Sequence, residues 1–474
     1  MRRYNRYRPR RRRIWPWVLM ALLILIGVGA WAVTRYLPQF ERIPPRIVAP
    51  KSAFWSEEVP IRVTLSDNRG LSEYQAVLTD GRRNIPVASN RFMIPIQTTQ
   101  LDLRLPPKSA PLLRQGHWVL LIRARDTSLL NRIIDNSTIA SITIEPDTVP
   151  PRLTLLAKSA TIARGGSALV VFKAEDINLK ETYIEAGGRR FVPQVYRRKP
   201  YYATLIAWPF RQTHLHAKLV AVDRAGNIAT KSFGFPVVYK KYKVSWIHAS
   251  DRFINGRITE VARTDPRYAD IANPLERFRA VNETMSLDNE KRIHTIARSA
   301  LSTQPITHWK VRPFYPMKSG KLVADFGDER HYYYDDPHKE ISRSYHVGYD
   351  LASVRHAPLR SSNPGTVLFA EPNGIYGRMP LIDHGFGLAT LYGHCSRLLV
   401  REGDHVTAGQ MIARSGMTGL ALGDHLHFGV LVHGIEVWPM DWMKANWIKK
   451  NIDEVFRQAD KRIAKDTSSS QGAS

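Results

Sequence analysis

Three stretches near the C-terminal end of the chain set its expected fold: HVGYDLAS (346–353), LIDHGFGLATLYGHCSRLL (381–399) and GDHVTAGQMIARSGMTGLALGDHLHFGV (403–430). Glycine turns separate the apolar runs, and HLHFGVLV has the character of a strand that follows a Gly-rich turn. Side chains on extended backbone alternate between two faces, so residues at even spacing share a face. This places His346 with Asp350 and His425 with His427, and the second pair can project into one cleft.

These residue types indicate a metal site. Two histidines and one carboxylate are a common ligand set for catalytic zinc, with a fourth position left for water. Zinc lowers the pKa of that water to about 7 and polarises a scissile carbonyl. His394 of the Tyr-Gly-His string and one histidine of the HLH pair would move protons and stabilise an oxyanion. The single cysteine, Cys395, excludes a disulfide framework and a CxxC site.

The chain contains a second HLH string, His214-Leu215-His216, which serves as an internal control. No HxxxD partner lies near it, and it falls in a region with the pattern of β-strands. We interpret it as a half-exposed structural pair on a strand.

The ordered set of HxGxD, YGH and Gly-rich HLHF resembles the lysostaphin/LytM-type zinc metallopeptidases, peptidase family M23, which cut peptide cross-links of bacterial peptidoglycan. The resemblance covers about Phe314 to Trp442. Its matching positions are Phe326-Gly327, His346 to Ala352, Asp383-His384-Gly385, Tyr392-Gly393-His394, Gly403-Asp404, Gly409-Gln410, Ser415-Gly416, Thr418-Gly419, Gly423, His425 to Phe428 and Pro439.

The resemblance implies a role for each matching residue. His346, Asp350 and His427 correspond to the ligands of one Zn²⁺ per catalytic domain. His425 corresponds to the histidine that handles the attacking water, and His394 to the one that stabilises the tetrahedral intermediate. The implied fold for residues 311–445 is a small antiparallel β domain with an open substrate groove.

Two departures from the family pattern stand out. Cys395 replaces an aliphatic residue, and we expect a small packed side chain rather than a fourth ligand. The segment 328–345 is expected to be a polar and aromatic loop that walls the groove. Its His331 and His338 are weaker candidates for extra ligands. Its aromatic run, Tyr332 to Tyr334, either grips glycan or peptide or packs the loop down.

The N-terminus predicts export. Residues 1–13 hold eight arginines and no acid, and residues 14–34 form an uncharged, apolar run. Its length suits the ~30 Å hydrocarbon core of a bilayer, and the positive-inside rule keeps the arginines in the cytoplasm. A cleaved signal peptide ending near Ala30-Trp31-Ala32 is the alternative, although the apolar run is long for one. We therefore expect a single-pass inner-membrane anchor and an extracytoplasmic, periplasmic catalytic domain.

The net charge of +27 falls to +19 without the eight arginines of that tail. Nucleic acid is not expected as a partner outside the cytoplasm. A basic exported domain favours anionic envelope polymers or lipid headgroups, and a merely soluble cationic surface is the alternative.

Residues 44–147 and 148–240 predict two related β-sandwich modules. Pro44-Pro45-Arg46 recurs as Pro150-Pro151-Arg152, an offset of 106, and VTLSDNRGLSEY from Val63 parallels VFKAEDINLKETY from Val171. The string VAVDRAGN resembles bacterial immunoglobulin-like domains, which implies a spacer or a module that binds an envelope protein partner.

Two regions predict helix. Residues 248–308 are expected to form a connector of two or three short helices, one of them capped by Asn273 with Pro274 in its first turn. Within residues 446–474 we expect the end of an amphipathic helix that starts at Asp441, followed by a disordered tail from Thr467.

The sequence therefore predicts a mainly β, membrane-anchored zinc endopeptidase that hydrolyses peptidoglycan stem-peptide cross-links. One alternative is a catalytically silent LytM-type module that activates a cell-wall amidase, although all five site positions are retained. A biotinyl or lipoyl carrier domain is excluded, because no lysine lies between Arg401 and His427. A third alternative places the main function in the β modules.

Overall fold

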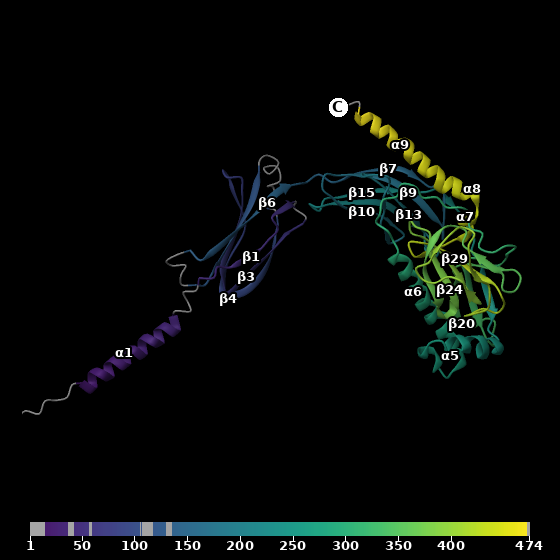
Figure 1. Ribbon diagram of the computed structural model, residues 1–474, viewed down its shortest axis with the longest axis horizontal. Helices are drawn as coiled ribbons and strands as arrows, with labels where there is room; N and C mark the ends of the chain where they lie inside the picture. Colours follow the sequence, from purple (N-terminus) through teal and green to yellow (C-terminus); the bar gives the residue numbers. More distant parts are fainter. Residues whose placement is uncertain are drawn as a thin grey trace, which may run out of the picture. The chain divides into compact units, whose positions relative to one another are not determined.

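The computed structural model describes residues 15–36, 42–55, 59–104, 106, 117–128 and 135–471. The chain divides into two compact units, residues 1–149 with 224–227 and residues 150–223 with 228–474. It is mainly β, as the sequence predicts (Figure 1).

The apolar N-terminal segment forms the helix α1 (Trp15–Tyr36). Its 22 residues are long and apolar enough to cross a membrane, and a signal sequence would share these properties. The predicted Arg-rich tail, residues 1–13, and Ile14 lie outside the described residues.

The first β module is a six-stranded sheet of order β1-β3-β5-β6-β2, with β4 paired to β3. Along β5 the buried side chains of Trp118, Leu120 and Ile122 alternate with more exposed ones, as in a half-buried strand. They share a hydrophobic core with Trp55 and Leu65 that contains residues of this module alone. The strands are β1 (Arg46–Val48), β2 (Ser52–Trp55), β3 (Ile61–Thr79), β4 (Asn84–Leu103), β5 (Trp118–Asp126) and β6 (Ser137–Pro146).

The second β module has two four-stranded sheets, of order β11-β10-β14-β15 and β12-β13-β9-β7, and a short parallel pair, β8 with β16. Its strands are β7 (Arg152–Lys158), β8 (Ile162–Ala163), β9 (Ser167–Glu175), β10 (Leu179–Ala186), β11 (Arg189–Phe191), β12 (Gln194–Val195), β13 (Tyr201–Ala207), β14 (Ala217–Asp223), β15 (Ile228–Phe233) and β16 (Val237–Val238).

The two modules pair their strands in the same pattern, which supports the duplication read from the sequence. The first part of β3 pairs with β1 and with the end of β4, as β9 pairs with β7 and β13. The second part of β3 pairs with β5 and with the start of β4, as β10 pairs with β14 and β11. The register of β3 shifts between Ser66 and Leu71. At the corresponding place in the second module the strand is interrupted, and its two parts are β9 and β10. The immunoglobulin-like assignment itself stays a prediction.

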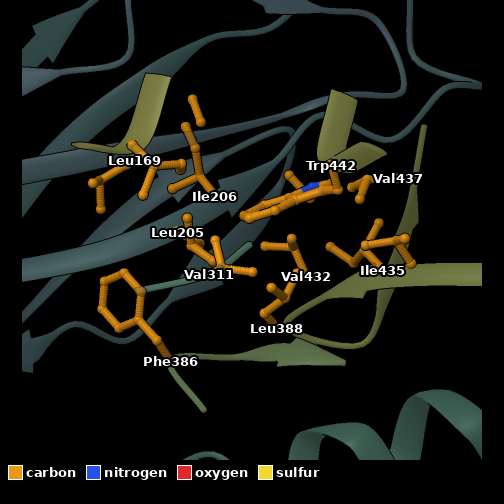
Figure 2. Close-up of a cluster of buried hydrophobic side chains, with 14 of the residues drawn as sticks. Leu169, Leu205, Ile206, Val311, Phe386, Leu388, Val432, Ile435, Val437 and Trp442 are labelled. Carbon is orange, nitrogen blue, oxygen red and sulfur yellow. The ribbon is translucent and has the colours of Figure 1, made fainter. Parts of the chain in front are cut away.

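The second module shares its hydrophobic core with the C-terminal β domain. Leu205 and Ile206 of β13 lie in one buried cluster with Val432, Ile435 and Trp442 (Figure 2). Burial of apolar side chains contributes about 25 cal/mol per Å² removed from water, so a continuous core joins these parts firmly.

Two buried hydrogen-bonding contacts cross the same boundary. Trp442 Nε1 donates to Ser167 Oγ at 3.0 Å, and Thr204 Oγ1 lies 3.1 Å from His433 Nε2. The second module and the C-terminal domain are therefore one packed body.

The connector is helical, as predicted, but it contains a longer helix than expected. Asn273 Oδ1 accepts hydrogen bonds from the backbone N–H groups of Leu275 and Glu276, and Pro274 occupies the first turn. From Pro274 the helix continues without a break to Ser299, so the prediction of short helices is wrong for this part of the connector. The elements are η3 (Phe253–Ile258), α3 (Thr259–Ala262), α4 (Pro266–Ala269), α5 (Pro274–Arg279), the π-helical η4 (Ala280–Met285) and α6 (Ser286–Ser299).

The segment expected to be a loop at 328–345 is a β-hairpin, and the loop prediction is wrong. Its strands β19 (Asp328–Tyr333) and β20 (Glu340–His346) pair antiparallel, and β17 (Val244–His248) adds to β19 in parallel. Tyr332 is buried, with its ring 5.3 Å from that of Phe278, and Tyr334 Oη donates to Asp251 at 2.5 Å. These two tyrosines pack the hairpin against the connector.

The C-terminal β domain is built on antiparallel pairs, as the family resemblance implies. Its main sheet has the order β18-β21-β29-β25-β24-β23-β27 with β30 on β29, and a small sheet has the order β22-β28-β26. The elements are β18 (Lys321–Ala324), β21 (Tyr349–Ala352), β22 (Pro358–Arg360), β23 (Gly365–Pro372), η5 (Gly374–Tyr376), β24 (Arg378–Asp383), β25 (Leu388–Gly393), β26 (Arg397–Leu398), β27 (His405–Val406), β28 (Met411–Arg414), β29 (Leu426–Val432) and β30 (Ile435–Val437).

The C-terminal helices break once, at the extended residue Lys444, and then run alongside β7 and β9 of the second module (Figure 1). The predicted apolar face is confirmed, because Ile448, Ile452 and Val455 are buried. The disordered tail predicted from Thr467 is wrong as far as Gln471, since Thr467 Oγ1 donates to the carbonyl of Ile463 within the helix. The elements are α7 (Pro439–Met443), α8 (Ala445–Ile448), η6 (Lys449–Asp453) and α9 (Glu454–Gln471).

Candidate metal centre and groove

The three predicted ligands come from three different strands. His346 ends β20, Asp350 lies in β21, and His427 lies in β29. Asp350 and His427 are direct partners in the antiparallel pairing of β21 with β29, so their side chains share one face of the sheet. The argument from even spacing on one strand is wrong for His346 and Asp350, because the chain leaves the strand at Val347 and Gly348 between them.

One atom from each ligand candidate converges on a common point. His346 Nε2 and His427 Nδ1 each lie 3.0 Å from Asp350 Oδ1, and the two nitrogens lie 3.1 Å apart. These three residues form a group able to hold a metal ion. Two imidazole nitrogens and a carboxylate oxygen at this spacing suit zinc, which binds such atoms at about 2.0–2.2 Å.

Neighbouring backbone holds the ligands in this arrangement. His346 Nδ1 donates to the carbonyl of Asp325 at 2.8 Å, which leaves Nε2 without its proton and able to bind a metal. Gly348 has no side chain, and a Cβ there would lie 2.5 Å from the ring of His427. The glycine in the HxGxD pattern is therefore required by close packing on a ligand.

Burial and mutual charge act on the pKa values of this group. Burial alone would raise the pKa of Asp350, but His346 and His427 hold it well below its ordinary value. Burial lowers the pKa of His427. A carboxylate beside neutral imidazoles is the protonation state that metal binding requires.

The two predicted catalytic histidines lie beside the ligands, with ring centroids 4.7 Å apart. His394 Nδ1 donates to the carbonyl of Thr418 and His425 Nδ1 to that of Gly423, both at 2.8 Å. His425 Nε2 lies 3.7 Å from Asp350 Oδ1. Burial lowers the pKa of His394 to about 3, and the neighbouring His425 and His427 act in the same direction.

The site opens into a groove of about 1580 Å³ with walls that extend well beyond the β domain. The hairpin provides Asp328, Arg330 and Tyr332, so the prediction that this segment walls the groove is confirmed. The connector also contributes to the lining, with Phe253 and Glu290 among its residues. No motif in the sequence assigns connector residues to this wall.

Two further residues beside the ligands were missed by the sequence analysis. The buried ring of Tyr376 in η5 meets the ring of His427 edge-on at 5.4 Å. Arg330 Nη2 lies 3.9 Å from Asp350 Oδ2. Neither lies in a quoted motif, and the arginine is brought to the ligand only by the hairpin that replaces the expected loop.

The weaker ligand candidates do not join the metal group. His331 Nδ1 lies 2.5 Å from Glu340 Oε2, and its ring stacks on that of Trp246 at 4.8 Å. His338 lies in the turn of the hairpin. The Cys395 thiol is buried, which raises its pKa, and it donates to the carbonyl of Tyr392 at 3.2 Å. It is a packed side chain, as predicted.

The control string His214-Leu215-His216 lies before β14 and not on a strand, so that part of its prediction is wrong. Both histidines are exposed, whereas Leu215 packs against the core. The packing of Leu215 therefore explains how this string is placed, and its two histidines take no part in the metal group.

Residues 344–439 match the model of peptidase family M23, so the C-terminal part of this chain holds an M23 peptidase domain. The peptidoglycan DD-endopeptidase ShyA of Vibrio cholerae is 38% identical over 101 residues, which are 21% of this chain and 23% of ShyA. The DD-carboxypeptidase/endopeptidase Mpg of Neisseria meningitidis is 37% identical over 95 residues, 20% of this chain and 22% of Mpg. The chain thus matches about a quarter of the length of these relatives.

Among solved structures, a zinc containing peptidase from Vibrio cholerae aligns over 69% of this chain and 80% of its own, with 15% identity and a TM-score of 0.27.

Proposed function

We propose that this protein is a zinc-dependent endopeptidase that hydrolyses peptide cross-links of peptidoglycan. The observation that carries the proposal is the convergence of His346, Asp350 and His427 at 3.0–3.1 Å, at the base of an open groove and beside two further histidines. The names of the relatives support a role in the cell wall.

The three ligand atoms would hold one Zn²⁺, with His346 Nε2, Asp350 Oδ1 and His427 Nδ1 as donors. When bound, the ion supplies Lewis acidity toward the scissile carbonyl and lowers the pKa of a bound water. The chain itself supplies the fixed tautomer of His346 through Asp325 and the close packing on His427 at Gly348.

His425 is suited to accept the proton of the attacking water. Its Nδ1 proton is donated to the Gly423 carbonyl, so in the neutral ring Nε2 carries a lone pair. That Nε2 lies 3.7 Å from Asp350 Oδ1, beside the ligand atoms. A base in this place can take a proton from water as its oxygen adds to the carbonyl carbon.

His394 is suited to act as a proton donor only after it has gained a proton. Its Nδ1 proton is donated to the Thr418 carbonyl, so neutral His394 offers a lone pair at Nε2. Burial lowers the pKa of His394 to about 3 before substrate binds, so this protonation requires the negative oxyanion of the tetrahedral intermediate beside the ring, which raises that pKa and is stabilised in return. When the carbon–nitrogen bond breaks, the proton that His425 took from water passes to the leaving nitrogen, and the products are one carboxylate and one amine.

The N-terminal half of the chain supports a proposal for the location and the partners of the protein. α1 would anchor the chain in the inner membrane with residues 1–13 in the cytoplasm and the catalytic domain in the periplasm. The β modules would carry the peptidase toward the wall and could bind an envelope protein. Stem peptides of peptidoglycan are the proposed substrate.

A catalytically silent module that activates an amidase is the second candidate. It requires no metal and no base, whereas this chain keeps all three ligands, His394 and His425 in contact with one groove. The retained set favours hydrolysis.

Digestion of purified sacculi by the detergent-solubilised full-length protein tests the choice, with mass spectrometry of the soluble products. We expect loss of cross-linked dimers with wild type and no loss with His425→Ala. Release that requires an added amidase and is equal for both proteins would establish the silent role instead.

A further inference from the structure

Arg330 stands on the groove face of the hairpin that ends in the ligand His346. Residues 328, 330 and 332 of β19 alternate onto one face, and all three line the groove. In the pairing of the hairpin, Asp328 lies opposite His346 and Arg330 opposite Ser344. The guanidinium is thereby brought to within 3.9 Å of Asp350 Oδ2, the carboxylate oxygen turned away from the two histidines.

A buried carboxylate, Asp328, lies beside the Nε atom of Arg330 and holds that end of the guanidinium. Asp328 is 6% exposed, and its Oδ1 accepts a hydrogen bond from Ser245 of β17 at 2.7 Å. Its Oδ2 lies 3.5 Å from Arg330 Nε. This carboxylate therefore engages the Nε edge of the guanidinium.

The outer edge of the guanidinium keeps donors for a ligand. A guanidinium has five N–H groups in a planar fork, and its Nη atoms can bind a carboxylate with two parallel hydrogen bonds. The contact of Nη2 with Asp350 Oδ2, at 3.9 Å, is too long for a hydrogen bond. The side chain is 24% exposed to the groove.

Another arginine of the same groove, Arg257, has a close carboxylate partner at its Nη atoms, whereas Arg330 has none among the described residues. Arg257 of the connector forms an ion pair with Glu260 at 2.8 Å through Nη1. It offers a matched control, because it has the same charge and lines the same groove without contact to a metal-ligand candidate.

The chemistry of peptidoglycan cross-links supplies an anion at the corresponding place. When the amine side of the bond is the D-centre of diaminopimelate, the carbon attached to the scissile nitrogen also bears a free carboxylate. Only that nitrogen and that carbon separate the carboxylate from the scissile carbonyl carbon. A terminal D-alanine presents the same arrangement, whereas the interior of a glycine bridge presents an uncharged amide.

We propose that Arg330 binds the free carboxylate next to the scissile nitrogen and thereby selects bonds whose leaving amine carries an α-carboxylate. This inference rests on the proposed peptidase function and specifies its substrate. It predicts cleavage of D-alanyl-diaminopimelate cross-links, trimming of a terminal D-alanine from uncross-linked stem peptides, and poor cleavage of glycine bridges.

Two synthetic peptides that differ only in this group test the proposal, one with an α-carboxylate on the leaving D-residue and one with a carboxamide. With the full-length zinc-loaded protein we expect kcat/KM to favour the carboxylate by about 10- to 100-fold, the range for a hydrogen bond to a charged group. In Arg330→Gln the ratio should fall to near one, and in Arg257→Gln it should stay as in wild type.

A binding measurement separates recognition from support of the metal. Metal-free Arg330→Gln should bind the carboxylate peptide about 10-fold or more weakly than metal-free wild type, with unchanged binding of the carboxamide. Equal loss on both peptides together with weaker zinc binding would make Arg330 a positioning residue for Asp350 and overturn the proposal.

The outcomes also separate the two proposals. If wild type cleaves both peptides at equal rates, carboxylate selection is wrong and the peptidase function stands. If wild type cleaves neither peptide nor sacculi, the peptidase function fails, and the metal-free binding comparison then decides carboxylate recognition alone.

Discussion

The two β modules share a strand pairing pattern but use their apolar surfaces differently. The first module closes its core on itself around Trp55 and Trp118. The second shares one core with the peptidase domain, in which Leu205 lies in the same cluster as Val432 and Trp442 (Figure 2). Duplicated sequence therefore predicts the pairing of strands without predicting what each sheet face packs against.

This difference assigns separate structural roles to the parts of the chain between α1 and the C-terminal β domain. The second module and the connector are structural parts of one body with the C-terminal β domain, since the module shares its core and the connector lines its groove. Only the first module has the independence expected of a spacer.

Truncation should give the largest effect. A chain that begins at Pro150 should fold and keep hydrolysis of soluble cross-linked peptides within about 3-fold of the full-length protein, because separately packed units act independently. A chain that begins at Val311 loses the partners of Val432 and Trp442 and should aggregate. Thermal unfolding and peptide hydrolysis measure both. A fully active, folded chain from Val311 would remove the distinction between the modules.

The next largest effect should come from removing a large buried ring from each core, because only one of the two substitutions should lower activity. Trp442 and Trp118 are both fully buried, and Trp→Ala in a core costs about 3–5 kcal/mol. Trp442→Ala should lower peptidase activity at 37 °C together with stability, whereas Trp118→Ala should destabilise the first module and leave activity unchanged. Activity on a soluble peptide, measured beside urea unfolding, checks this. Equal losses of activity would contradict it.

A single hydrogen bond should show the same coupling on a smaller scale. Ser167→Ala removes the acceptor of Trp442 Nε1, and a buried N–H without a partner costs about 1–3 kcal/mol. Ser141→Ala, at an exposed position on β6 of the first module, should stay within about 0.5 kcal/mol of wild type. Chemical denaturation of both variants gives the comparison, and a neutral Ser167→Ala would show that the contact carries no stability.

The smallest expected effect depends on pH. Burial raises the pKa of Asp441 to about 7, against the opposing charges of Lys444 and Lys240. A folded-state pKa above that of the unfolded chain costs stability once the carboxyl ionises, and the cost disappears as pH falls toward about 4. Asp441→Asn should therefore have a higher Tm than wild type at pH 8, and the gap should narrow as pH falls below about 7 and close only near pH 4. A gap independent of pH would mean that ionisation is not its cause.

Much of the metal centre could be predicted because its residues lie in ordered motifs. His346, Asp350, His394, His425 and His427 were all placed at the site by their resemblance to a family, and the structure brings them together. The argument from even spacing on one strand fails for His346 and Asp350, because the chain leaves the strand between them.

The remainder of the site depends on long-range packing that leaves no local signal. Arg330 reaches Asp350 because β17 and β20 flank β19, and hairpin residues with polar composition were expected to form a loop. Connector residues enter the groove wall because an uninterrupted helix from Pro274 to Ser299 packs there. The tail from Thr467 to Gln471 is helical although its composition is that of a disordered end.

Zinc dependence tests the central claim most directly. Full-length protein, stripped with a chelator and then restored with zinc, would be incubated with sacculi beside His427→Ala and the ligand-distant His331→Ala. We predict one bound zinc per chain and restored loss of cross-linked dimers for wild type and His331→Ala, and neither for His427→Ala. Dimer loss that persists in chelated protein or in His427→Ala would contradict a zinc peptidase centred on these three residues.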